Sequence, residues 1–302
     1  MNAVYHNSFY AMGTRCHMVF PGMDEDAGER VFGVVRQEVN RVESSLSRFI
    51  PYSEIAIINK NAGKEPVQVS EEIFDILTKC RIFFKKTRGA FDISMRPVLE
   101  YWKQRTSDDQ ADLGLYETMD ATGMSRIQLD ENERTVAFEN DSLEIDLGGF
   151  GKGYALERCR KLLQDFSVKD AFISFGESSV LAMGRHPAGD CWRVGLNNYS
   201  SPGQALHTFD VTDASVSTSS NFFVDDYGKL CNHRHVINPF SGYPVERCMT
   251  VSVCSASPVV AEVLSTAFLV SSEEVIKSVK EEYGCDVVKT DYAPEVPEKA
   301  MF

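Results

Sequence analysis

The sequence contains no hydrophobic run long enough to cross a membrane. A membrane helix needs about 20 consecutive apolar residues, and no segment of these 302 residues approaches that length. The stretch Met1–Met12 carries polar side chains throughout, so it does not have the pattern of a secretory leader. We therefore expect a cytoplasmic protein with no transmembrane segment from the sequence as given. An exported or membrane-anchored protein would require a leader that has been removed.

The chain also lacks an excess of basic residues. Its 31 Lys and Arg against 44 Asp and Glu give a formal net charge of −13. A protein that binds nucleic acid needs a basic surface to neutralise phosphates, so this balance excludes nucleic acid as the main partner. A small anionic ligand remains compatible, provided that local cations and helix N-termini surround it.

The eight cysteines include no Cys-x-x-Cys pair. Structural zinc sites use closely spaced thiolates, so we expect no site of that kind, and we interpret the cysteines as small core residues or reduced thiols. This usage favours a reducing compartment. Internal repeats and low-complexity linkers are also absent. With 43% hydrophobic residues over 302 positions, the chain can form one large domain or two closely packed ones.

Glycine, by contrast, is concentrated within residues 143–157. Apolar residues alternate from Leu143 to Leu147 and predict a buried strand; glycines over 148–153 predict a turn, and helical spacing resumes at Tyr154. Glycines suit a backbone that approaches a ligand closely. A helix N-terminus favours a phosphate, and Lys152 adds positive charge there. A turn that only packs a helix on a sheet is an equally good interpretation of this stretch alone.

Two familiar phosphate-binding motifs do not fit this stretch. A Walker A loop requires Ser or Thr after its lysine, whereas Gly153 follows Lys152. A dinucleotide fingerprint requires Gly-x-Gly-x-x-Gly, and these glycines are spaced differently.

Apolar periodicity predicts the remaining elements. Amphipathic helices are expected over 24–47, from Ser70 to Gly89, from Ser257 onward and over 272–283. Strands are expected over 16–20, 171–175, 180–183, 192–196, 206–211, 249–254 and 285–289, with a hairpin over 126–138. The polar residues 105–125 are expected to form a loop, the hydroxyl run 215–220 a solvated turn, and 233–238 the end of a strand.

Three short patterns contain candidate site residues, each with a structural alternative. Asp92 follows a helix stop and is either a ligand contact or, more often, a turn cap. His233 and His235 lie on one side of a strand, but no third ligand is near, which favours His235 as a single functional histidine. Glu262 and Thr266 share one face of an apolar helix. They either pair internally or hold a hard cation such as Mg²⁺ through oxygen.

Taken in order, several motifs resemble those of the ApbE family, the Mg²⁺-dependent FAD:protein FMN transferases. The resemblance extends from about Met12 to Thr266. Asp146-Leu-Gly-Gly-Phe-Gly-Lys-Gly-Tyr-Ala155 is similar to the family signature Asp-Leu-Gly-Gly-Ile-Ala-Lys-Gly-Tyr-Ala. The other matching blocks are Met12-Gly13-Thr14, Leu46-Ser47-Arg48-Phe49, Ala90-Phe91-Asp92, Ser217-Thr218-Ser219, His235-Val-Ile-Asn-Pro239 with Ser241-Gly242-Tyr243-Pro244, and Ala261-Glu-Val-Leu-Ser-Thr-Ala267.

The resemblance implies an α+β fold, with mixed sheets and helices in two interlocked lobes around an FAD cleft. It implies a single domain over residues 1–290 and a flexible tail over 291–302. FAD would be the substrate and Mg²⁺ the cofactor. The implied FAD contacts are Met12, Phe49, Ala90, Phe91, Asp92, Asp146, Lys152 and Ile237. The implied metal ligands are the backbone carbonyl of Gly149 and the side chains of Glu262 and Thr266.

The implied activity transfers FMN from FAD through a phosphoester bond to a Thr or Ser of a partner flavoprotein, with release of AMP. His235 is our candidate general base; its alternative role is an orienting hydrogen bond in the proline turn. An FAD-binding or storage protein without turnover, and an FAD pyrophosphatase giving FMN and AMP, remain open.

The sequence departs from the family pattern at three positions. Glu262 and Asn238 replace aspartates, and Glu177 stands where the family often has glycine. We expect the longer Glu262 side chain to weaken or shift the tight octahedral site that Mg²⁺ requires. We expect these changes to affect turnover more than FAD binding.

Overall fold

A computed structural model describes residues 3–105, 113–176, 178–201, 203–225, 229–232 and 235–292. Its centre is a seven-stranded sheet in which every pair of neighbours is antiparallel. The strands, in their order across the sheet, are β1 (Val4–Ala11), β2 (Thr14–Pro21), β6 (Ala171–Phe175), β7 (Ser179–Met183), β10 (Ala214–Ser220), β13 (Cys248–Ser255) and β14 (Asp286–Tyr292). This sheet and its helices confirm the predicted mixed α+β class.

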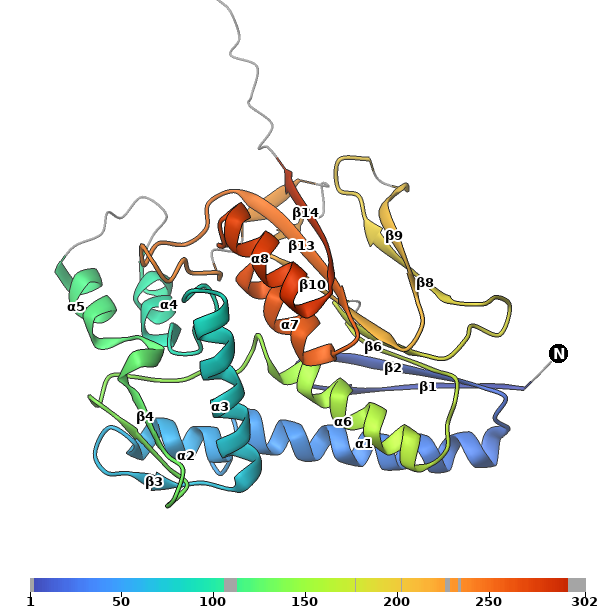
Figure 1. The fold of residues 1–302 in the computed structure, drawn as a ribbon, viewed down its shortest axis with the longest axis horizontal. Coiled ribbons are helices and arrows are strands. Elements are labelled where there is room, and N and C mark those ends of the chain that lie inside the picture. Colours follow the sequence, from blue (N-terminus) through green and yellow to red (C-terminus); the bar gives the residue numbers. More distant parts are fainter. Residues whose placement is uncertain are drawn as a thin grey trace, which may run out of the picture.

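Helices cover one face of the sheet (Figure 1). They are α1 (Glu25–Leu46), α6 (Gly151–Asp165), α7 (Pro258–Ala267) and α8 (Glu273–Tyr283). The main hydrophobic core lies between them and the sheet, where α7 packs on β10 and β13 and α6 packs between α1 and α7. α7 is buried along nearly its whole length, so its polar side chains must find partners inside the protein.

The opposite face of the sheet is covered by a hairpin of β8 (Trp192–Asn197) and β9 (Ala205–Val211). Trp192 fixes this hairpin to the sheet. Its ring stacks on Phe172 with the ring centroids 5.0 Å apart, and its indole N–H donates to the carbonyl of Met183 at 3.0 Å. A second, smaller apolar cluster therefore lies between the sheet and the hairpin.

Most of the remaining elements gather at the end of the molecule away from this hairpin (Figure 1). The helices there are α2 (Glu54–Asn61), α3 (Glu71–Lys86), α4 (Arg96–Lys103), α5 (Leu113–Ala121) and the 3₁₀ turn η1 (Met124–Arg126). A three-stranded sheet joins β3 (Val67–Gln68), β5 (Thr135–Phe138) and β4 (Ile127–Asp130). A short separate pair consists of β11 (Phe222–Val224) and β12 (Leu230–Asn232).

The predicted helix starts are confirmed by their caps. The side chains of Asp24, Ser70, Ser257 and Ser272 each accept a hydrogen bond from a backbone N–H in the first turn. Ser53 caps α2 in the same way. α3 ends at Lys86, before the predicted stop at Gly89.

The predicted strand over 143–147 is wrong. Its apolar side chains are buried and alternate with more exposed ones, but the segment pairs with no strand in the described part of the chain. Instead, the Asn59 amide bonds both the N–H and the carbonyl of Ile145, at 2.8 and 2.9 Å. The N–H of Asp146 donates to the carbonyl of Ile93 at 2.8 Å. One side chain thus replaces the partner strand, and α6 begins at Gly151, earlier than predicted.

Three other predictions also differ from the structure. The expected loop 105–125 contains α5, and residues 106–112 lie outside the described part of the chain. The hydroxyl run 215–220 is not a solvated turn but most of β10. Residues 235–238 form no strand, only an isolated bridge from Ile237 to Pro244.

The end of the chain differs slightly from its predicted boundary. β14 continues to Tyr292, so it includes the first two residues of the predicted tail. Residues 293–302, to which the rest of that prediction refers, lie outside the described part of the chain.

Candidate functional site

A cavity of about 900 Å³ is bordered by the segment before α4, the glycine turn before α6, β6, β8, β10, α7 and residues 235–239. These elements come from distant parts of the sequence. The predicted site residues that line the cavity are Ala90, Phe91, Asp92, Asp146, Gly149, Lys152, His235, Ile237, Glu262 and Thr266. The fold therefore brings together most of the predicted set.

Met12 and Phe49 do not line this cavity. Met12 has a positive φ of 53°, and its N–H donates to the Glu43 carboxylate at 2.8 Å. Phe49 is 76% exposed, with the Arg48 guanidinium 3.8 Å from its ring centroid. Arg48 also bonds Asp146 at 2.7 Å, so Phe49 is linked to the cavity wall through this arginine.

The glycine turn lies directly against α7. Asp146 closes the turn, because its carboxylate accepts the N–H of Gly148 at 2.8 Å. A Cβ on Gly149 would meet the Thr266 hydroxyl oxygen at 3.3 Å and the Phe91 ring at 3.5 Å. The backbone of Gly149 thus lies beside α7, as its predicted role requires. The next helix, α6, begins without a side-chain cap.

Gly153 allows α6 and α7 to approach closely. A Cβ there would lie 2.6 Å from the Pro258 carbonyl oxygen and 2.7 Å from the Glu262 Cβ. The packing interpretation of the glycine stretch therefore holds for Gly153, whereas Gly148 and Gly149 line the cavity. The two interpretations apply to different glycines.

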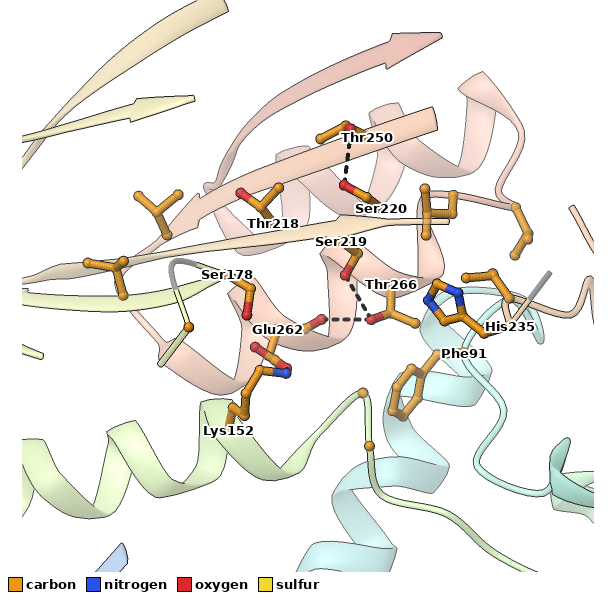
Figure 2. A pocket seen from close by; sticks show the side chains of 18 of the residues that line it. Phe91, Lys152, Ser178, Thr218, Ser219, Ser220, His235, Thr250, Glu262 and Thr266 are labelled. Atoms are coloured by element: carbon orange, nitrogen blue, oxygen red, sulfur yellow. Dashed lines mark hydrogen bonds and ion pairs between the residues drawn. The ribbon is translucent and has the colours of Figure 1, made fainter. Parts of the chain in front are cut away.

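Glu262 is the most buried charged side chain of the site, with 3% of the residue exposed. One carboxylate oxygen accepts from the Lys152 ammonium at 2.6 Å. The other accepts from the hydroxyls of Ser179 at 2.5 Å and Ser217 at 2.8 Å. Figure 2 shows the Lys152 ammonium next to the Glu262 carboxylate. A buried carboxylate requires such partners, and the sequence motifs did not reveal this set.

β10 supplies hydroxyls on both of its faces. Ser217 and Ser219 face α7, and the Ser219 hydroxyl lies 3.2 Å from that of Thr266. Thr218 and Ser220 point to the other side of the strand (Figure 2), where Ser220 contacts Thr250 at 3.1 Å. Alternating sides are expected of a strand. The period was concealed in the sequence because every side chain of the run after Val216 is a hydroxyl.

The cavity reaches both faces of the sheet near the start of β7. The last pair between β7 and β10 joins Ser179 to Ser217, whereas β10 continues to Ser220. The cavity lining includes Ser219, which faces α7, and Thr218, which faces the hairpin side. Glu177, which follows Gly176 in the sequence, lies outside the described residues.

The donor chemistry of α7 and the glycine turn fits a hard cation. The Gly149 carbonyl, the Thr266 hydroxyl and the Glu262 carboxylate are all oxygen groups, which Mg²⁺ prefers. The Lys152 ammonium on Glu262 shows that this position already accepts a positive charge. Among the described residues, no group of three or more His, Cys, Asp or Glu side chains could hold a metal. A metal here would therefore need backbone, hydroxyl or substrate oxygens.

Asp92 is a turn cap that also borders the cavity. Its carboxylate accepts the N–H and the hydroxyl of Ser94 at 2.8 and 2.6 Å, and the N–H of Met124 at 3.2 Å. Burial raises the pKa of this carboxyl, and the hydrogen bonds from Ser94 and Met124 oppose that rise. The cap interpretation is thus confirmed, and it is compatible with a ligand contact.

His235 lies at the start of a loop held against α4. The N–H of Asn238 donates to the Tyr243 carbonyl at 2.8 Å, and the indole of Trp102 donates to the Gly242 carbonyl at 2.7 Å. Asn238 also accepts the N–H of Phe240 at 2.9 Å. Figure 2 shows the exposed His235 imidazole on the same side of the cavity as Thr266 and Phe91.

No helix in the described ranges is both long and apolar enough to span a membrane. The model of the ApbE family matches residues 12–288. A curated relative, the FAD:protein FMN transferase of Klebsiella pneumoniae (strain 342), is 28% identical, covering 88% of this chain and 82% of its own. The enzyme of that name from Escherichia coli (strain K12) is 25% identical, covering 91% of this chain and 81% of its own.

Solved structures show the same fold. The ApbE protein from Thermotoga maritima superposes with a TM-score of 0.82 at 22% identity, with 97% of each chain covered. The flavin transferase ApbE from Vibrio cholerae gives a TM-score of 0.81 at 19% identity, again covering 97% of each chain.

Proposed function

The chain belongs to the ApbE family of transferases, and from this premise we propose that it transfers FMN from FAD to a serine or threonine of a partner flavoprotein. The reaction depends on Mg²⁺ and releases AMP. The observation that carries the proposal is one cavity that combines the uncapped start of α6, Lys152 and the oxygen groups of α7. A diphosphate needs this combination of cation, backbone N–H groups and metal ligands.

In this proposal, two parts of FAD lie against different walls of the cavity. The diphosphate would lie at Gly149 and Lys152, where the start of α6 adds the positive end of the helix dipole. A flat ring would pack against the apolar wall of Phe91, Ile237 and Leu269. Gly149, Glu262 and Thr266 would hold Mg²⁺, which, when bound, withdraws charge from the phosphates and stabilises the leaving AMP.

The transfer step exchanges one phosphorus–oxygen bond for another. The acceptor hydroxyl oxygen bonds to the FMN-side phosphorus, and the bond from that phosphorus to the bridging oxygen breaks. AMP leaves with the electron pair. His235 takes the hydroxyl proton, because a neutral imidazole accepts a proton near pH 7.

The test is the mass of an acceptor. A flavoprotein subunit that carries FMN on threonine is prepared without its flavin and incubated with the protein, FAD and Mg²⁺. We expect the acceptor to gain the mass of FMN less one water, with one AMP released for each FMN attached. FMN and AMP formed at the same rate without acceptor would instead identify a pyrophosphatase. Intact FAD after hours of incubation would identify a storage protein.

His235 provides a sharper test of the transfer step. The His235→Asn variant should lose about 10²- to 10⁴-fold in kcat, the usual contribution of a general base, while its FAD affinity stays within about twofold of wild type. His207→Asn is the matched control, because His207 is exposed on β9 and does not line the cavity. An unchanged kcat for His235→Asn would remove His235 from the mechanism and leave it an orienting role.

A further inference from the structure

The contact between Lys152 and Glu262 gives one amino group two competing partners. The ammonium that lies 2.6 Å from the Glu262 carboxylate is also the cation that the proposed function assigns to the diphosphate, and the same carboxylate is the proposed metal ligand. An ammonium that contacts both anions shares its single positive charge between them, and it repels a metal cation that binds the same carboxylate.

We propose that Lys152 is an exchangeable counter-ion of Glu262. It neutralises this carboxylate before substrate arrives, and it moves to the FAD diphosphate when Mg²⁺ takes its place on Glu262. This inference rests on the proposed function for the identity of the substrate. It assigns Lys152 a positioning role that links metal binding to FAD binding.

The burial of the two side chains supports an exchange rather than a fixed pair. The Glu262 side chain is 4% exposed, so its charge always requires a counter-charge, whereas the Lys152 side chain is 23% exposed and faces the cavity. The Ser179 and Ser217 hydroxyls hold the other carboxylate oxygen in place. The carboxylate is therefore fixed, and the lysine is the partner that can move.

The position of Lys152 in α6 also supports an exchange. It lies in the first turn of the helix, where the helix dipole disfavours a cation and no acidic residue of that turn compensates for it. An anion bound at this helix end would be stabilised by the dipole and by the ammonium together. Before that anion binds, Glu262 is the nearest source of negative charge.

The exchange predicts opposite effects for the two halves of the pair. In the Lys152→Met variant, Mg²⁺ no longer has to displace an ammonium, so Mg²⁺ affinity without FAD should rise on the order of tenfold, within the usual range of coupling between sites. FAD affinity should fall. In the Glu262→Gln variant, Lys152 is released to the diphosphate, so FAD affinity in the presence of a chelator should rise several-fold, again on the scale of such coupling.

The experiment measures binding only. Titration calorimetry gives the affinity for Mg²⁺ alone, and quenching of flavin fluorescence gives the affinity for FAD with either Mg²⁺ or EDTA. Lys161→Met is the matched control, because Lys161 is an exposed lysine of the same helix with no lining role in this cavity; it should leave each affinity unchanged. Circular dichroism confirms that each variant is folded.

A fixed structural pair would give a different result. If Lys152→Met lowers or does not change Mg²⁺ affinity, and Glu262→Gln lowers metal-free FAD affinity, the exchange is overturned. If Lys152→Met fails to fold, the Glu262→Gln measurement decides alone. A protein that binds no FAD would end the proposed function, whereas the Mg²⁺ titration of Lys152→Met would still test the exchange.

Discussion

At the residue scale, Gly153 determines how closely two helices approach. The space for its missing side chain is filled by the backbone of Pro258 and the Cβ of Glu262. Neither atom can rotate away, because both belong to or adjoin the backbone of α7. The distance between Lys152 and Glu262 therefore depends on a neighbouring residue that has no side chain.

Gly153→Ala should destabilise the protein by about 1–3 kcal/mol, the typical cost of overpacking, and should weaken Mg²⁺ and FAD binding because α7 is pushed away. Gly33→Ala is the control. Gly33 is also helical, but a Cβ there meets nothing within 4 Å, so it should stabilise the protein by about 0.5–1 kcal/mol. Urea unfolding of the two variants measures the difference, and equal stabilities would contradict the packing argument.

At the element scale, an ion network ties α1, α3 and α6 together. Arg41 on α1 bonds Glu38 at 2.8 Å and Glu72 at 2.7 Å. Arg158 on α6 bonds Glu38 at 2.8 Å, and the Tyr154 hydroxyl bonds Glu72 at 2.6 Å. Hydrogen bonds from Arg41, opposed by burial, lower the pKa of Glu38 and of Glu72 below their ordinary value of 4.5.

This network makes stability depend on acid pH. A lowered pKa in the folded state stabilises the protein above the ordinary pKa, and this contribution is lost as pH falls through the lowered pKa. In the Arg41→Met variant, the stability lost between about pH 6 and pH 3 should therefore be smaller by about 1 kcal/mol, the scale of a partly exposed network. Chemical denaturation at several pH values measures this.

The control for Arg41 is an exposed ion pair. Arg88 and Glu274 lie 3.0 Å apart with side chains 59% and 76% exposed, so Arg88→Met should leave the acid profile as in wild type. A profile for Arg41→Met parallel to that of wild type would show that the network does not stabilise the fold.

Elements were predictable where their signal is local. Helix caps such as Ser70 and Ser257 predict the start of a helix, because each bonds a backbone N–H less than four residues away. The segment 143–147 has the composition of a strand, but its partner is the side chain of Asn59, far away in the sequence. No local pattern encodes such a contact. The run 215–220 does not indicate a strand locally, because hydroxyls suit a turn equally well and its pairing partners, β7 and β13, are other segments of the chain.

In the site, too, the sequence predicts residues that lie in local motifs but not the contacts between distant residues. Asp92, Gly149 and His235 lie in recognisable motifs, so they could be assigned to one cavity from the sequence. The pairing of Lys152 with Glu262 joins residues 110 positions apart. Each residue had a predicted role, but that they bind one another follows only from the packing of α6 on α7.

At the scale of the whole molecule, the sheet separates a large core from a small one. β10, β13 and α7 lie next to the large core, whereas β8 and β9 pair only with each other among the described strands. The hairpin is attached through the smaller cluster around Trp192. Peripheral units of this kind open at lower free energy than the core.

Native-state hydrogen exchange should therefore separate the two regions. We expect amides of β10 and β13 to exchange only on global unfolding and those of β8 and β9 to exchange earlier. Trp192→Phe, which keeps an aromatic ring but removes the donor to Met183, should speed exchange in β8 and β9 more than in β10. Equal opening free energies in all four strands would show that the hairpin and the sheet unfold as one unit.

The order of strands in the main sheet also governs when the site can form. β2 and β6 are neighbours, with Val19 opposite Phe172, yet the whole excursion through α1 to α6 separates them along the chain. Closing so long a loop is slow. During synthesis the β1–β2 hairpin therefore emerges before β6, and the edge of β2 that pairs with β6 remains unpaired until β6 has been made. Thr266 is synthesised later still, so a ribosome-bound chain has no complete cavity until α7 has been made.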